Sequence, residues 1–316
     1  MKNKTMEQIN GMKAQTFGVE VEGNGIRREA AAQVAAEFFG TYHCEYTGEG
    51  YQTWTAWDAQ GRRWKFQRDS SILGPDDEKT ELVTPILTYD DMENFFELLR
   101  RLRKAGMKSS PNRGCGVHIH VGLKGTDGRD HDARSLRNLA NIMASHEEMI
   151  GKAIWIDQNR VDRYCQTVNL HFLERVNKEK PTTMDALKKV WYEANHATWH
   201  QEAHYNESRY HMLNLHASFT KGTVEFRLFQ FSNPHGDSKG GIHAGKMKAY
   251  IQLCLAMSNM AKTVRTASPK KQQQENEKFA MRTWLIRMGL IGDEFKTARE
   301  HLIKNLSGNA AWRHAA

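Results

Sequence analysis

Short runs of alternating apolar and polar residues are the clearest pattern along the chain. Residues 16–22, TFGVEVE, alternate valine with glutamate, and residues 115–122, CGVHIHVG, place two histidines on the polar positions. Residues two apart in an extended strand point to the same face. The alternation therefore predicts strands that bury one face and present carboxylates or imidazoles on the other.

Helical spacing of apolar residues marks the segments between these strands. In residues 90–105 the apolar stripe includes Met92, Phe95, Phe96 and Leu99. Their spacing of three and four is the period of an amphipathic helix. The same reasoning predicts further helices at 27–39, 134–155, 184–195 and 242–261, and strands at 43–46, 53–58, 64–68, 81–86, 210–219 and 223–231.

This order of elements predicts an α+β fold, in which helices cover a largely antiparallel sheet. Residues 1–15 are expected to form an N-terminal arm, and residues 16–261 the main domain. Within that domain, the mixed and polar residues 158–208 are expected to form a lid or substrate insert. The low-complexity run SPKKQQQENE at 268–277 predicts a linker. Residues 262–316 are therefore expected to be a polar linker and a basic helical tail.

The net charge of +8 is concentrated near the C-terminus. Residues 262–316 carry 11 Lys/Arg against 5 Asp/Glu, which leaves the main domain nearly neutral. This distribution argues against a nucleic-acid partner. No apolar run approaches the roughly 20 residues that cross a bilayer, and the N-terminus has no apolar signal core. The four cysteines form no CxxC pair, so a reduced, cytoplasmic setting with buried thiols is expected.

Acidic and imidazole side chains recur on the polar positions of four predicted strands. Glu20 and Glu22 share a face of the first strand, and Glu81 and Glu225 lie in two later apolar runs. On one strand, such a face is most simply a solvent-exposed sheet surface. Carboxylates gathered from several strands repel one another, by about 1 kcal/mol per close pair. A divalent cation relieves that repulsion, and a carboxylate set with one imidazole suits Mg²⁺ or Mn²⁺.

Five short motifs occur in an order that resembles a known family. They are FGVEVEG, DSSI followed by TELVTP, GCGVHIHVG, RYHMLNLHA and TVEFRLF, and together they cover roughly residues 16–261. Their order resembles that of the amidoligases, which belong to the superfamily of glutamine synthetase and γ-glutamylcysteine ligase. The resemblance implies a glutamine-synthetase-like catalytic domain, a curved antiparallel sheet that forms a funnel with Mg²⁺ at its neck. It further implies that ATP phosphorylates a substrate carboxylate, and that an amine or ammonia then attacks the acyl phosphate.

The same resemblance implies roles for individual residues. His120 is expected near the ATP phosphates, and Arg227 is expected to neutralise the transferring phosphoryl group. Arg209 is expected to hold a phosphate or a substrate carboxylate. The residues expected as metal ligands are Glu20, Glu22, Glu81, His118 and Glu225, and those expected near substrate are Asp69, Ser71, Asn214 and Lys246. In the DSSI segment, Ser70 stands where the family has glycine.

Two other patterns carry alternative functions. Residues 240–247, GGIHAGKM, fit the start of a phosphate-binding loop, but Met247 occupies the position where Ser or Thr would hold Mg²⁺. His196, His200 and His204 are four apart, so on one helix they would share a face and bind zinc. That pattern supports a zinc-dependent hydrolase as the alternative function.

Basic residues provide a third alternative. Six lysines and arginines lie between residues 100 and 113, and with the basic tail they fit a binding protein for an acidic partner. The function that the motifs favour is an ATP-dependent carboxylate–amine ligase. Its expected substrates are a carboxylate, on an amino acid, peptide, cell-wall fragment or protein side chain, and an amine or ammonia.

Overall fold

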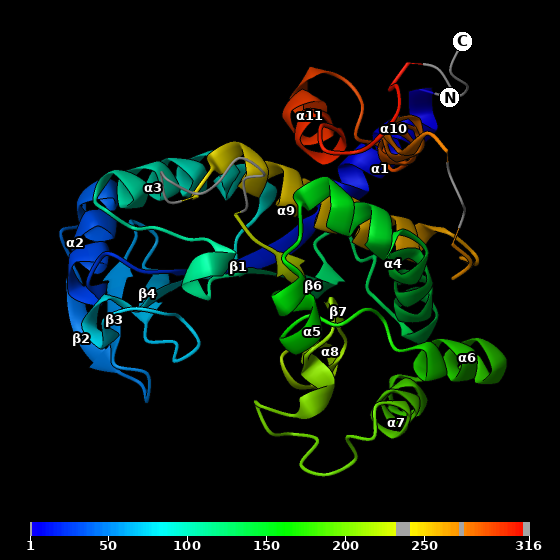
Figure 1. Cartoon of the computed structure of the whole chain (residues 1–316), viewed down its shortest axis with the longest axis horizontal. Coiled ribbons are helices and arrows are strands. Elements are labelled where there is room, and N and C mark those ends of the chain that lie inside the picture. The colour runs from blue at the N-terminus through cyan, green and yellow to red at the C-terminus, as the bar shows by residue number, and fades with distance from the viewer. Residues whose placement is uncertain (1, 232–240, 272–274, 312–316) are drawn as a thin grey trace. The chain divides into compact units, whose positions relative to one another are not determined.

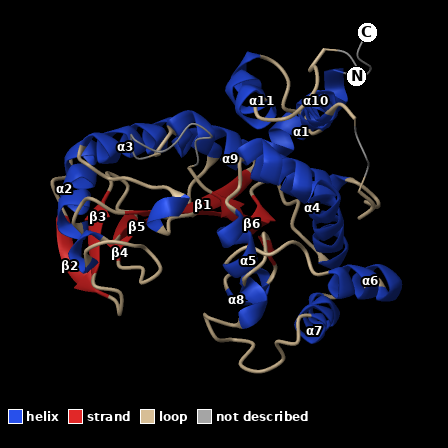
Figure 2. Cartoon of the chain, viewed as in Figure 1, coloured by secondary structure: helices blue, strands red, loops and turns tan. Residues whose placement is uncertain are grey.

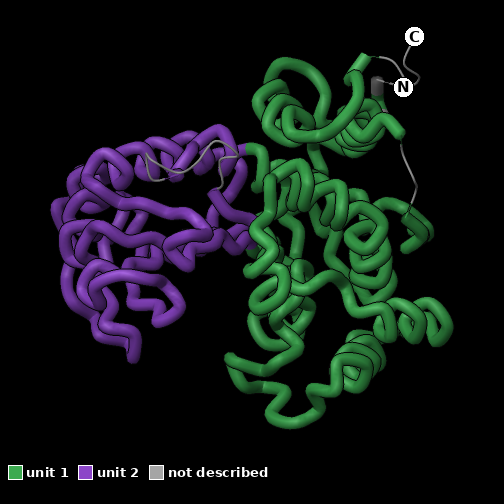
Figure 3. The backbone as a smooth tube through the Cα atoms, in the orientation of Figure 1, with its two compact units in different colours: residues 1–16, 120–228, 249–316 green, residues 17–119, 229–248 purple. Residues whose placement is uncertain are grey.

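The computed structural model describes residues 2–231, 241–271 and 275–311. The chain forms two compact units, which Figure 3 colours separately. Unit 1 comprises residues 1–16, 120–228 and 249–316, and unit 2 comprises residues 17–119 and 229–248. The described strands form an eight-stranded sheet in the order β2-β3-β4-β5-β1-β6-β8-β7. Figure 2 separates these strands from the helices. The expected α+β class is confirmed.

Unit 2 contains an antiparallel set of strands and two helices packed on one another. β2 pairs with β3, β3 with β4, β4 with β5, and β5 with β1, all antiparallel. The helix α2 packs on β2, β3 and β4 and against α3 (Figure 1). The bounds are β1 Gln15–Gly23, α2 Arg28–Phe39, β2 Cys44–Gly48, β3 Thr53–Trp57, β4 Arg63–Gln67, β5 Thr80–Val83 and α3 Met92–Lys104.

Local sequence explains why these elements form in unit 2. The apolar stripe of α3 is buried, with Phe95 and Phe96 almost fully covered, as its three-and-four spacing predicts. Gly40 ends α2 in the left-handed conformation, at φ 69°, which glycine adopts without steric cost. Between β3 and β4, the carboxylate of Asp58 accepts hydrogen bonds from the backbone of Gln60 and Arg62. That side chain closes the hairpin turn.

Unit 1 is mostly helical. α11 packs on α4 and α10, and α6 packs on α4 and α7. Asn138 of α4 also donates to the carbonyl of Ala261 in α9. The bounds are α1 Lys2–Lys13, β6 Val117–Gly125, α4 Ala133–Ile154, α5 Gln158–Arg163, α6 Leu170–Glu179, α7 Met184–Ala194, β7 Leu213–Asn214, α8 His216–Thr220, β8 Thr223–Phe229, α9 Ala244–Thr263, α10 Glu277–Arg287 and α11 Lys296–Ile303. The chain passes from one unit to the other within β1, β6, β8 and α9.

Most predicted elements are confirmed to within a few residues, and one strand is wrong. Residues 210–219 were expected to be a strand, but only Leu213 and Asn214 pair with β8, and α8 follows at once. The helix forms because residues 216–220 pack against α7 and the short turn 207–209. The sequence also gave no signal for α1. In the expected linker at 268–277, residues 272–274 lie outside the described residues.

The structure contradicts the histidine pattern, and the glycine-rich motif still lacks the Ser or Thr that its function requires. α7 ends at Ala194, and His196 and His200 both have positive φ, so the three spaced histidines do not share a helix face. In the glycine-rich motif, Gly240 lies outside the described residues, while Gly245 and Lys246 lie within the first turn of α9. Met247, at the position where such a loop carries Ser or Thr, is fully buried in α9. Among the described helices, none has both the length and the apolar character needed to cross a membrane.

Candidate functional site

The strand register of unit 2 sets three polar side chains in one row. Glu22 of β1 lies opposite Glu81 of β5, and Glu81 lies opposite Gln67 of β4. Residues directly opposite in an antiparallel pair have their Cβ atoms about 5 Å apart. Gln67 Nε2 donates to Glu81 Oε2 at 2.8 Å. The register therefore forces two carboxylates together and gives one of them an amide partner.

The first histidine of β6 joins this row. His118 Nδ1 lies 2.9 Å from Glu20 Oε2, and its Nε2 lies 3.6 Å from Glu22 Oε1. The backbone N–H of Gly116 donates to Glu22 Oε2. Each carboxylate of β1 thus has a fixed orientation that depends on the segment 116–118.

The loop after β4 adds a fourth carboxylate. Asp69 Oδ1 accepts from the backbone N–H of Ser71 at 2.6 Å and from its hydroxyl at 2.7 Å. This loop lies against Gly114, which has φ 69° and whose added Cβ would come within 2.5 Å of the Ser71 carbonyl oxygen. A glycine is required there. Ser71 therefore acts here by orienting Asp69.

These side chains offer two overlapping sets of metal ligands, both containing Glu81. One set is Glu20, Glu81 and His118, and the other is Glu22, Asp69 and Glu81. Within each set the ligand atoms all lie within 4.8 Å of one another. We call these five residues the carboxylate cluster. Four of the five predicted metal ligands belong to it, and Asp69, expected near substrate, is its fifth member.

Burial distinguishes this cluster from an ordinary polar sheet surface. Glu22 is 4% exposed, and Glu81 and His118 are each 5% exposed. The simpler interpretation, a solvent-facing sheet surface, is therefore wrong for these residues. Burial raises the pKa of Glu81 well above its usual value, and the charges of Glu20, Glu22 and Asp69 raise it further. Hard oxygen donors with one imidazole, held together against their mutual repulsion, fit Mg²⁺ or Mn²⁺.

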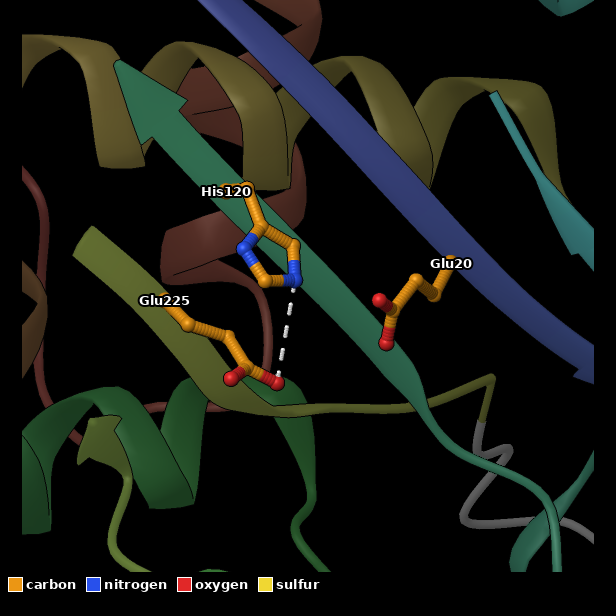
Figure 4. Close-up of side chains that lie close together, drawn as sticks. All are labelled: Glu20, His120 and Glu225. Atoms are coloured by element: carbon orange, nitrogen blue, oxygen red, sulfur yellow. Dashed lines mark ion pairs between the residues drawn. The ribbon is translucent and has the colours of Figure 1, made fainter. Parts of the chain in front are cut away.

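A second polar group lies in unit 1, along β8. Arg227 Nη1 donates to Glu225 Oε1 at 2.5 Å, and Asn214 Nδ2 donates to Glu225 Oε2 at 2.6 Å. His120 Nε2 lies 3.8 Å from Glu225 Oε1, as Figure 4 shows with a dashed line, and its Nδ1 lies 2.9 Å from Thr223 Oγ1. Thr223, Glu225 and Arg227 alternate along β8 with buried apolar residues. The predicted residues His120, Asn214, Glu225 and Arg227 are thus brought together here.

A cavity of about 210 Å³ adjoins this group in unit 1. Its lining includes Arg209, Asn214, His216 and Glu225, which are buried, and Glu202, which is exposed. His216 Nδ1 lies 2.6 Å from the hydroxyl of Tyr192. Burial and the nearby charge of Arg209 lower the pKa of His216, so this imidazole is neutral near pH 7. The cavity lining therefore includes a guanidinium, two carboxylates, an amide and a neutral imidazole.

Some functional residues were not found by sequence reasoning. Gln67 and Thr223 hold Glu81 and His120, respectively, by hydrogen bonds. Both lie on the polar positions of alternating strands, so the same alternation could have found them. Lys246, expected near substrate, lies in unit 2 in the first turn of α9, where its backbone N–H lies 3.3 Å from His243 Nδ1.

The sequence matches the model of a family described as "Putative amidoligase enzyme" over residues 13–258. The chain belongs to this amidoligase family, and membership supports its assignment to the carboxylate–amine ligases. No curated protein matches the sequence.

One solved structure similar to this chain is the crystal structure of a bifunctional glutathione synthetase from Pasteurella multocida. The TM-score is 0.49 and the sequence identity is 13%. The match covers 96% of this chain and 49% of that one, so this chain spans about half the length of that protein.

Proposed function

We propose that this protein is an ATP- and Mg²⁺-dependent ligase that joins a carboxylate to an amine or ammonia through an acyl phosphate. The observation that carries the proposal is the carboxylate cluster of unit 2, in a chain that belongs to the amidoligase family. Four carboxylates and one imidazole, largely buried, are costly for a protein to hold without a cation. Phosphoryl transfer from ATP is a reaction that requires such cations.

Within this proposal, the cluster residues hold Mg²⁺ or Mn²⁺. Glu20 and His118 serve one set, Glu22 and Asp69 serve the other, and Glu81 belongs to both. When bound, the ions neutralise the charge that develops on the phosphates of ATP. Glu225, which the sequence analysis expects to be a metal ligand, is also proposed to bind a metal ion through its carboxylate. We also propose that the sheet is of the curved, funnel-forming type found in the glutamine synthetase superfamily.

The residues of unit 1 act on the phosphoryl group and the substrate. The guanidinium of Arg227 is directed by Glu225 and by the carbonyl of Tyr164, at 3.4 Å from its Nε. We propose that it binds a γ-phosphate oxygen, as His120 does with a ring nitrogen. A fixed cation at that position stabilises the transition state without reorganisation.

The chemistry then follows from the poor electrophilicity of a carboxylate. A carboxylate oxygen attacks the γ-phosphorus, and ADP leaves. The amine then attacks the acyl carbon, and phosphate leaves with the original carboxylate oxygen. The attacking nitrogen must be neutral, so its proton passes to a base or to water before the amide forms.

Oxygen-18 labelling tests this reaction directly. The purified full chain is incubated with ATP, MgCl₂, an amine or ammonium chloride, and a panel of carboxylates labelled with ¹⁸O. We expect ADP and phosphate to form in equal amounts with an amide, and one ¹⁸O atom to appear in the phosphate. Label in AMP instead would indicate an acyl adenylate and would refute the acyl phosphate.

Matched variants connect the reaction to the cluster. Glu81→Gln is expected to lower amide formation on the order of 10³-fold, whereas Glu97→Gln, on an exposed face of α3, is expected to leave it unchanged. Amide formation that persists in EDTA would contradict the metal requirement. No ATP consumption with any carboxylate in the panel would contradict the ligase itself.

A further inference from the structure

The edge strand β2 of unit 2 has no neighbour on its outer side among the described strands. The sheet order places it first, and Figure 2 shows it at the outer end of the strands of unit 2. We propose that this edge binds an extended segment of another protein, rich in lysine or arginine, which adds to the sheet as a further strand. The inference goes beyond the ligase reaction, because β2 contributes no residue to the carboxylate cluster or to the cavity of unit 1.

The backbone of β2 offers hydrogen-bonding groups along this edge. Cys44 lies opposite Ala56 of β3, and the N–H of Trp57 donates to the carbonyl of His43 at 3.2 Å. In an antiparallel ladder, opposed pairs alternate between those that share hydrogen bonds and those that do not. Since the pair next to Cys44 is a bonded one, the N–H and C=O groups of Cys44 and Tyr46 point away from β3. These are the donors and acceptors that an added strand uses.

The edge also presents exposed aromatic side chains. Tyr46 is 58% exposed, and its ring centre lies 5.9 Å from that of Trp54 in β3. Tyr42, just before the strand, is 78% exposed. An aromatic ring at the edge of a sheet provides apolar contact for an added strand, and its face attracts the cation of a lysine or arginine side chain. The edge therefore offers contact area beyond its backbone.

The charge of this edge is negative, in a protein whose net charge is +8. Residues 29–61, which include β2, contain five acidic residues and no lysine or arginine. Glu45 of β2 is exposed, as are Glu29 and Glu37 of the neighbouring α2. None of these three glutamates has an ion-pair partner among the described residues. Burial raises the pKa of Cys44, and the charges of Glu29 and Glu37 raise it further, so both glutamates lie close to the edge.

This charge decides which partner the edge fits. A second copy of the chain, paired about a two-fold axis at β2, would bring two acidic edges together, and like charges at close range repel. A basic segment places its cations beside Glu45 on one face of the sheet and beside the glutamates of α2 on the other. The five residues of β2, with a register shift between Tyr46 and Gly48, limit the contact to a short segment. The partner is therefore a short, extended and basic stretch of chain.

Designed peptides test the proposal on the unmodified full chain. The probe is the fluorescein-labelled peptide acetyl-TKVKVKT-amide, in which lysine alternates with valine. The matched control is acetyl-TEVEVET-amide, which has the same length and the opposite charge. We expect fluorescence anisotropy to show binding of the basic peptide and binding of the acidic peptide that is weaker by about 10-fold or more. Added NaCl should weaken the basic peptide, because salt screens exposed charges.

Methylation of the peptide's backbone nitrogens separates strand addition from simple charge attraction. An added strand turns every second N–H toward β2. N-methylation at those positions is expected to weaken binding by about 10–100-fold, whereas N-methylation at the intervening positions should change it little. In the protein, the basic peptide should slow hydrogen exchange at the N–H groups of Cys44 and Tyr46. The N–H of Glu45 faces β3 and should change less.

Charge reversal locates the contact on the protein. Glu45→Lys is expected to weaken binding of the basic peptide by about 3–10-fold, because it replaces an opposite charge by a like charge beside the added strand. Glu174→Lys, at an exposed position of α6 in unit 1, is the matched control and should change binding little. The comparison of N-methylated peptides uses the unmodified protein, so it remains decisive even if a variant fails to fold.

Several outcomes would overturn the inference. They are no binding of the basic peptide, equal binding of the acidic peptide, N-methylation effects that do not alternate, and equal effects of the two charge reversals. If the protein alone sediments as a dimer in which the N–H groups of Cys44 and Tyr46 are already protected from exchange, a second copy occupies the edge and the inference is likewise overturned. None of these results bears on amide formation, which the ¹⁸O experiment tests separately.

Discussion

The two polar groups of this protein differ in the sign and balance of their charges. The carboxylate cluster of unit 2 is almost entirely acidic, and its members reinforce one another's need for a cation. The cavity of unit 1 contains both signs, with the buried cation of Arg209 and with Asn214 Oδ1, which has no hydrogen-bond partner among the described residues. The one-signed cluster supports the proposed ion, whereas a mixed cavity with unmatched donors and acceptors favours a small molecule that matches them.

The difference shows that the burial of polar groups indicates what kind of ligand they bind. An exposed acidic row would be screened by water and would imply little. The same row buried, with a raised pKa at its centre, supports the proposed cation site. In the cavity, pKa shifts are less informative than buried polar atoms that have no hydrogen-bond partner. The following predictions test that contrast, beginning with the largest expected effect.

Glu81→Gln removes the ligand that both metal sets share. We expect amide-forming activity to fall on the order of 10³-fold, since the loss of even an outer partner of a metal costs about 10–100-fold and here two sets are affected. We also expect the thermal stabilisation by MgCl₂ to disappear in a melting experiment. If MgCl₂ still raised the melting temperature of this variant, the carboxylate cluster would not be the Mg²⁺ site, and the distinction between the two groups would fail.

Acid is expected to affect the two units in opposite directions. In unit 1, His131 is buried between the hydroxyls of Ser135 and Ser258, and burial, together with the charge of Lys262, lowers its pKa to about 3. The unfolded chain therefore binds more protons below pH 6.5, and stability is lost as the pH falls from 6.5 towards 3. In unit 2, the raised pKa of Glu81 means that acid relieves repulsion.

Urea unfolding at pH 7 and pH 4 measures the contribution of His131. About 3 kcal/mol of unfolding free energy should be lost by pH 4 through this group alone. His131→Asn, which keeps hydrogen-bonding capacity without titrating, should lose correspondingly less. An identical pH dependence in the variant would show that His131 does not remain neutral in the folded protein.

Arg227→Lys tests whether a planar, bidentate cation is needed in unit 1. We expect kcat to fall about 100-fold, because lysine keeps the charge and loses the fork geometry. Mg²⁺-induced stabilisation should be retained, since the five cluster residues are unaltered and lysine keeps a positive charge beside Glu225, the further proposed ligand. Steady-state kinetics and melting temperatures, measured on the same preparation, separate the two effects. A loss of the Mg²⁺ response would contradict this prediction.

The smallest effect is expected from Gln67→Leu. This variant removes the hydrogen bond to Glu81 and leaves all five cluster residues in place. Outer partners of metal ligands contribute about 10–100-fold to affinity, and we expect the lower end, about 10-fold, in the Mg²⁺ concentration that gives half-maximal activity. Gln60→Leu, in the exposed turn between β3 and β4, is the control.

The strands that carry the candidate site could be predicted because their alternation is local. Val19 and Val21 are buried as the sequence predicts, and Glu20, Glu22 and His118 share the other face. Register between strands is not local, so the row that joins Gln67 to Glu81 could not be derived from either strand alone. Alternation likewise could not reveal that the polar face is buried.

The error at residues 210–219 has a similar cause. Apolar and polar residues alternate in LNLHASF, residues 213–219, and this pattern suggested a strand over 210–219. Packing of residues 216–220 on α7 decided in favour of a helix, and the hydroxyl of Tyr192 lies against the ring of His216. Tertiary contacts of this kind override short-range pattern. The same contacts build one wall of the cavity, so short-range pattern could not indicate it.

The sharing of Glu81 between two ligand sets has a thermodynamic consequence. If two ions bind there, neither has an affinity of its own, because occupancy of one set alters the charge and orientation of a ligand in the other. Linkage requires the influence to be equal in both directions. A titration would then follow a cooperative or anticooperative curve in place of two independent isotherms, and replacing Glu81 would remove the coupling together with the sites.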